Sequence, residues 1–316
     1  MGTLAPASAV PNTPNGPNGA HVCDACDACD VHEALACGRR FEYGGDAARA
    51  LHAYGVALAL ADTPALRAEA VRRVGDAHRK REAWDAARAA DAESLALARA
   101  HGLGDLEAEA LNATATVSIL RGDVAGAEPL FRRALACRPG PRVRGLVLTN
   151  LGLCAARGGE HALAVELFAA SLDCYREANY ERGVLMAINN VAAAHIETGE
   201  PEAALPLLRE AAQLARDLME LDLLLLTVRN EGEACLKLGR LDEAERRVGE
   251  ALGHFATVGG ESRRAECLVI LGDVLRAHHT PAQETAAMRC YARAVEIAEA
   301  VGAAHVVERA RAAMRG

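Results

Sequence analysis

The sequence predicts an all-α protein built as a stack of about seven helical hairpins and one closing helix. Three observations support this fold class. Small residues recur with a period of 37 to 43 residues, glycines recur at the expected turns between helices, and only 3% of the residues are aromatic while alanine is abundant. A lone hairpin cannot bury its apolar stripe, so each hairpin needs neighbours, and repetition supplies them.

The clearest hairpin runs from Thr149 to Leu172. Gly158 and Gly159 end its first predicted helix, and a second helix runs from His161 to Leu172. Apolar and small side chains in the second helix are spaced four and three residues apart, which places them on one face. The sequence of this segment therefore predicts two short helices joined by a tight turn.

Four positions recur in each predicted hairpin. The first is a small residue in the first helix, and the second and fourth are an alanine and a small residue in the second helix. The first-helix positions are Gly38, Gly75, Ala115, Gly152, Ala192, Gly232 and Gly272. The third position is mostly large and comprises Tyr54, Asp91, Phe131, Phe168, Leu208, Val248 and Tyr291, among which Asp91 departs from the pattern. Small residues let helix backbones approach closely, and large ones fill the space beside them.

This order of small residue, turn glycine, alanine, large residue and small residue resembles the tetratricopeptide repeat, from about Val31 to Val301. The period exceeds the roughly 34 residues of the standard repeat. The longer form is similar to the repeats of kinesin light chain and of large bacterial ATP-dependent transcriptional regulators. The resemblance implies a right-handed α-solenoid with repeats at about 31–61, 64–101, 104–137, 141–177, 180–217, 220–257 and 261–301.

Three parts of the chain are predicted on this basis. Residues 1–21 are rich in Pro, Asn, Gly and Ala and are expected to be a disordered tail. Residues 22–302 form the solenoid, with a helix that begins near Val22 and runs into the first repeat. Residues 303–316 form a capping helix, in which Val306 and Val307 share one face and the arginines are expected to face water.

Composition and motifs argue against several function classes. The formal net charge is −8 and no stripe of Lys or Arg is present, so we expect no nucleic-acid partner. No apolar run is long enough for a membrane span and no signal peptide is recognisable, which favours a cytoplasmic protein. Phosphate-binding loops, zinc-protease motifs and nucleophile elbows are missing from the sequence, so we predict no enzyme activity, catalytic residue or cofactor.

Three asparagines form the main candidate binding row. Asn150, Asn190 and Asn230 recur at 40-residue spacing, two residues before the small residue of their first helix. The resemblance places first helices along a concave groove, where an amide can both donate to and accept from a peptide backbone. Two alternatives stay open: asparagine suits an exposed helix face, and it can hydrogen-bond between neighbouring repeats.

Four charged residues extend this candidate site. Arg73 holds the asparagine position in the second repeat, and Arg157, Glu197 and Lys237 follow the asparagines by two turns. We therefore expect a non-enzymatic scaffold that binds a peptide or protein segment in the groove. The alternative is a regulatory sensor module that acts with a separate transcriptional or signalling effector.

A cysteine cluster near the N-terminus is the weakest candidate. Cys23, Cys26 and Cys29 have spacing known from metal sites, and His32 and Cys37 follow. Residues six apart on a helix lie ~9 Å apart along its axis, too far to share one metal ion. We predict an amphipathic helical segment and no metal site.

Overall fold

The computed structural model describes residues 30–43, 46–121, 123–258 and 260–315. This part of the chain contains fifteen α-helices and no strand, and the helices pack as a solenoid of hairpins. The all-α prediction is therefore confirmed. None of the helices in these residues combines the length and the apolar character needed to cross a membrane.

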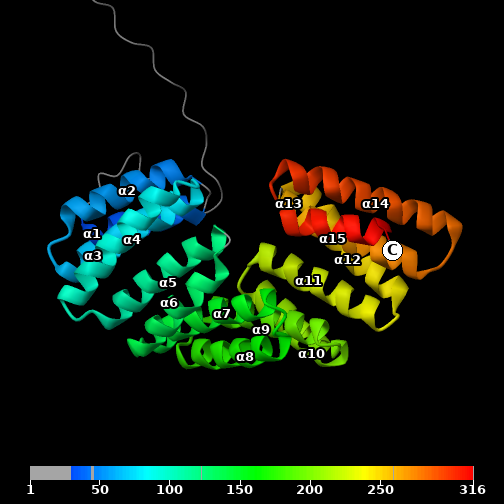
Figure 1. Ribbon diagram of the computed structural model, residues 1–316, viewed down its shortest axis with the longest axis horizontal. Helices are drawn as coiled ribbons and strands as arrows, with labels where there is room; N and C mark the ends of the chain where they lie inside the picture. The colour runs from blue at the N-terminus through cyan, green and yellow to red at the C-terminus, as the bar shows by residue number, and fades with distance from the viewer. Residues whose placement is uncertain (1–29, 44–45, 122, 259, 316) are drawn as a thin grey trace, which may run out of the picture. The chain divides into compact units, whose positions relative to one another are not determined.

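Seven helix pairs and a final helix follow one another along the chain (Figure 1). Their bounds are α1 Val31–Tyr43, α2 Ala47–Leu60, α3 Pro64–Lys80, α4 Trp84–Ala100, α5 Gly104–Leu120, α6 Val124–Ala136, α7 Pro141–Arg157, α8 His161–Glu177, α9 Glu181–Glu197, α10 Pro201–Asp217, α11 Leu221–Lys237, α12 Leu241–Val258, α13 Glu261–Ala277, α14 Pro281–Ala300 and α15 Ala304–Arg315. The expected helix around Cys23, Cys26 and Cys29 lies outside the described residues.

The chain divides into two compact units, residues 1–97 and residues 98–316, and each is described here by itself. In the first unit, helices α1, α2 and α3 enclose a core that contains Leu35, Tyr54 and Ala77. The predicted division into a tail, a solenoid and a capping helix stays a prediction.

In the second unit, the first helix of each pair packs on its own second helix and on the first helix of the next pair. The contacts α5·α7, α7·α9, α9·α11 and α11·α13 make one row of first helices, which α15 continues through its contact with α13 (Figure 1). This row is the surface on which the resemblance placed the groove.

In the hairpins whose small residue is glycine, this residue faces the side chain at the third recurring position. A Cβ atom on Gly152 would lie 2.6 Å from a ring carbon of Phe168, and one on Gly272 would lie 2.5 Å from the ring of Tyr291. Real Cβ atoms do not approach other atoms so closely, so the rings of Phe168 and Tyr291 occupy the space that glycine leaves. The repeat pattern therefore encodes the contact between the two helices of a pair.

Helix α15 departs from expectation at one residue. Val306 and Val307 are buried, in keeping with the predicted apolar face. Arg309, however, does not simply face water, because its Nη2 lies 3.1 Å from Oε1 of Glu233 and 3.4 Å from Oδ2 of Asp273. The helix lies against α13, so its long arginine side chain reaches across to the carboxylate on α11.

Candidate functional site

A hollow of about 310 Å³ in the second unit is lined by the first helices α7 and α9 and by the second helix α8. Its floor is mostly apolar and includes Leu153, Phe168 and Ala193. Polar and charged side chains stand at its border and comprise Asn190, Arg157, His161 and Glu197. We call this feature the apolar hollow.

A second hollow of about 210 Å³ lies between α9, α11, α13 and α15. Charged and polar groups dominate its lining, so we call it the polar hollow. Its polar side chains are Glu197, Arg229, Asn230, Glu233, Glu266, His305 and Arg309. The two hollows share Ala193 and Glu197, so they adjoin at α9, and we call the two together the groove.

Asn190 is the predicted asparagine that best fits a binding role. Its side chain is half-buried at the border of the apolar hollow. No hydrogen bond joins its amide to another residue that the structure describes. Its donors and acceptor therefore remain available to a ligand.

Asn150 and Asn230 instead bond to neighbouring repeats. Nδ2 of Asn150 donates to Oδ1 of Asn112 over 2.7 Å, and Nδ2 of Asn230 donates to Oδ1 of Asn189 over 3.4 Å. The structure thus favours the alternative that these two amides link adjacent first helices. Since an amide has two donors and one acceptor, their role toward a ligand stays a prediction.

Asn190 differs because of the residue that faces it on the preceding first helix. That residue belongs to the position three residues before the small residue of each first helix. Asn112 and Asn189 occupy the same position in their first helices, and Thr149 occupies it in α7. The hydroxyl of Thr149 points inward, where it lies 2.7 Å from Oγ of Ser171 and donates to the carbonyl of Gly145 over 3.0 Å. Asn190 therefore lacks the asparagine partner that Asn150 and Asn230 find.

The predicted charged residues are spread over different places. Arg157 and Glu197 border the apolar hollow, and their role toward a ligand stays a prediction. Lys237 is exposed at the end of α11 and lines neither hollow of the groove. Arg73 lies in the first unit, on helix α3, and the other three residues lie in the second unit.

Most of the charged side chains that line the polar hollow form ion pairs with one another. Arg229 pairs with Glu266, and Arg309 pairs with Glu233. Glu197 forms no ion pair or hydrogen bond with the residues that the structure describes. One carboxylate of the groove is thus left for a ligand.

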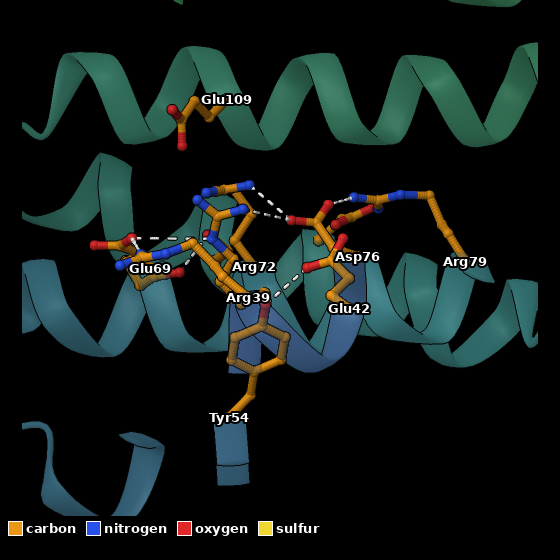
Figure 2. A network of polar contacts seen from close by, with 12 residues as sticks. Arg39, Glu42, Tyr54, Glu69, Arg72, Asp76, Arg79 and Glu109 are labelled. Carbon is orange, nitrogen blue, oxygen red and sulfur yellow. Dashed lines mark hydrogen bonds and ion pairs between the residues drawn. The ribbon is translucent and has the colours of Figure 1, made fainter. Parts of the chain in front are cut away.

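Arg73 belongs to a separate network of charged side chains in the first unit, part of which Figure 2 shows. Arg73 pairs with Asp76 and Glu69, while Arg79 donates to the fully buried Asp91 over 2.7 Å. Burial raises the pKa of Asp91 from 3.8 to about 6, although the positive charge of Arg79 opposes this change. Asp91 stands at the position that a large apolar residue holds in most other hairpins. The side chains of Asp91 and Arg79 therefore occupy the place that the ring of Phe168 or Tyr291 occupies in its hairpin.

Nothing in the described residues indicates a metal or redox centre. No three His, Cys, Asp or Glu side chains within them gather as a metal site would require. Cys235 and Cys267 are buried free thiols, and burial raises their pKa to about 11 and about 12. Such thiols are poor nucleophiles because little thiolate forms.

A third hollow, of about 520 Å³, opens between α6, α7 and α8. Its lining includes the apolar side chains of Val124, Leu163 and Leu167 and the charged pair of Glu128 and Arg132. The second helices α6 and α8 and the first helix α7 all contribute to its lining, and it is the competing surface for a partner.

Comparison with known families matches residues 144–217 to the tetratricopeptide repeat model. This segment covers α7 to α10 almost completely and includes Asn150, Asn190 and Glu197. A comparison with curated protein sequences finds no match.

Solved structures with the same fold are numerous, although their sequences differ widely. Aspartyl phosphate phosphatase F from Bacillus subtilis is 13% identical, with a TM-score of 0.65 over 84% of this chain and 70% of that chain. A Rap protein complexed with Competence and Sporulation Factor is 15% identical, with a TM-score of 0.63 over 85% of this chain and 77% of that chain.

A signal transduction ATPase with numerous domains from Pyrococcus horikoshii, which has a tetratricopeptide repeat sensor, is 11% identical. Its TM-score is 0.64 over 89% of this chain and 44% of that chain. At these identities the likeness shows the fold alone.

Proposed function

We propose that this tetratricopeptide-repeat protein binds an extended peptide or protein segment in the groove formed by the apolar and polar hollows. The observation that carries the proposal is Asn190, whose amide is unengaged at the border of an apolar hollow. An extended segment offers backbone donors and acceptors at regular spacing, and its side chains can enter hollows of this size.

The solved relatives support a binding role in general terms. One was determined as a complex of a Rap protein with Competence and Sporulation Factor, so the fold accommodates a separate molecule. Another bears the name of a phosphatase, but at 13% identity only the fold carries over. We propose a non-enzymatic scaffold that works in the cytoplasm.

A regulatory sensor is the second candidate. The repeats of the signal transduction ATPase are described as a sensor, and they share this fold. In that case the partner is an effector protein, and binding in the groove changes the effector's activity. Identification of the partner separates the two candidates, because a sensor requires an effector among the bound proteins.

Capture from a cell lysate with mass spectrometry tests the proposed groove. The native chain is compared with Asn190→Ala and with Gln213→Ala, which removes an exposed amide from the second helix α10. Loss of one typical hydrogen bond weakens binding by ~0.5–1.5 kcal/mol. A partner reduced by Asn190→Ala and kept by Gln213→Ala supports the groove, whereas equal capture by all three chains contradicts it.

A triple variant, in which Asn150, Asn190 and Asn230 are all replaced by alanine, extends this test. It is expected to lose more of the partner than Asn190→Ala if the bonded asparagines also contact the ligand. Circular dichroism must show that its helices remain intact, because Asn150 and Asn230 also link repeats.

A further inference from the structure

We infer that the groove selects a segment in which an apolar side chain and a basic one are neighbours. The apolar side chain enters the apolar hollow, and the basic side chain pairs with Glu197. This inference rests on the proposed function and adds the chemistry of the partner to it.

The apolar hollow is suited to one side chain of moderate size. Leu153 is 39% exposed, and the small side chain of Ala193 lines the same hollow. Both residues belong to first helices whose other faces are buried in the solenoid. A ligand side chain that covers Leu153 and Phe168 removes apolar surface from water, which favours binding.

One carboxylate that lines the polar hollow, that of Glu197, has no cation in contact with it among the described residues. Three carboxylates line it, those of Glu197, Glu233 and Glu266, and two guanidinium groups, those of Arg229 and Arg309, pair with the last two. Glu197 has no ion pair with the described residues, although it interacts electrostatically with Arg309, and it also borders the apolar hollow. A basic residue next to the apolar one therefore reaches it.

Arg309 shows that a guanidinium fits this end of the groove. It comes from α15, 76 residues along the chain from Glu233, and donates to the Glu233 carboxylate over 3.1 Å. The chain thus places its own arginine on the carboxylate one repeat away from Glu197. A ligand arginine or lysine at Glu197 repeats the same chemistry.

Arg157 and Glu197 place opposite charges at the apolar hollow, and this restricts where a basic side chain can bind. It borders the apolar hollow from α7, whereas Glu197 borders it from α9. A ligand with its basic residue toward α9 meets the carboxylate, and the reversed ligand brings that residue to another cation. The preference is therefore one of position and not of total peptide charge.

A random dodecapeptide library displayed on phage is the probe, selected on the full chain. The best peptide and a version with its basic residue changed to glutamine are then titrated onto four chains. These are the native chain, Glu197→Gln, Glu197→Lys and the control Glu202→Gln, which alters an exposed carboxylate on the second helix α10.

The native chain and Glu202→Gln should prefer the basic peptide by about threefold to tenfold, as a charge-assisted contact at a partly exposed site allows. Glu197→Gln should bind both peptides equally, and Glu197→Lys should prefer the neutral one. An unchanged preference in Glu197→Gln, or a library that enriches no basic residue beside an apolar one, overturns the inference.

Ala193→Leu fills the hollow and separates this inference from the proposed function. With circular dichroism showing intact helices, it should weaken the selected peptide at least tenfold. If the selected peptides respond to Ala193→Leu or Asn190→Ala but ignore Glu197, only the inference about the basic residue fails. If no selected peptide responds to any of these changes, the groove itself is refuted as the binding site.

Discussion

Replacement of Gly152 by alanine tests the contact between the small and the large residue of the α7–α8 hairpin. The new Cβ would lie 2.6, 2.7 and 3.1 Å from three carbons of the Phe168 ring, which is 3% exposed and has little room to move. Overpacking of this kind costs ~1–3 kcal/mol. Alanine also favours a helix over glycine by ~1 kcal/mol, which offsets part of the loss.

Gly249→Ala is the matched control, because a Cβ at this position in α12 meets no atom within 4 Å. It should gain the ~1 kcal/mol of helix propensity without any overpacking. The difference between the two variants therefore isolates the contact with Phe168 and should be ~1–3 kcal/mol. Urea unfolding followed by circular dichroism measures it for both.

Phe168→Leu should rescue Gly152→Ala, since the fifth repeat already pairs Ala192 with Leu208. In a double-mutant cycle, the coupling energy between the two positions should favour the double variant by ~0.5 kcal/mol or more. If Gly152→Ala is as stable as Gly249→Ala, or if the two changes at 152 and 168 are additive, the pairing of small and large positions does not determine the packing.

Three further predictions concern buried polar groups and thiols. The pKa of Asp91 is about 6 in the folded chain and 3.8 in its usual state, so between these pH values the folded chain binds a proton that the unfolded chain has lost. The free energy of unfolding should therefore fall by up to ~3 kcal/mol as the pH rises from about 4 to above 6. Asp91→Asn should flatten this pH profile in urea titrations, and an unchanged profile would assign the dependence to other groups. Asn112→Ala removes the acceptor of Asn150 and should cost ~0.5–1.5 kcal/mol in the same assay, whereas a neutral result would show that the amide bond between α5 and α7 adds nothing. Cys267, whose pKa burial raises to about 12, should react with a thiol reagent far more slowly than the partly exposed Cys137, as residue-resolved mass spectrometry can follow; equal rates would contradict its burial.

The hairpins were predictable from sequence because their packing is local. The contact between Gly152 and Phe168 joins residues 16 positions apart, and Gly272 and Tyr291 are similarly close in the chain. A small and a large residue that recur at such short range appear directly as a pattern. The same pattern also located the first helices that border the groove.

The partners of the groove residues could not be predicted in the same way. Asn150, Asn190 and Asn230 look alike in sequence, and they differ because of the residue one register away in the preceding first helix. The sequence shows that threonine stands at position 149 where asparagine stands at positions 112 and 189. The consequence for Asn190 can be recognised only once the packing of neighbouring first helices is known. The contact of Arg309 with Glu233 spans 76 residues and has no local pattern at all.

Site-specific photo-crosslinking tests the central claim most directly. A photoreactive amino acid is placed at position 153 in the apolar hollow or, as control, at position 213 on the second helix α10, and the chain is irradiated with its captured partner. We predict a crosslink to the partner from position 153 and none from position 213. A crosslink from position 213 alone would place the partner on the second helices and contradict binding in the groove.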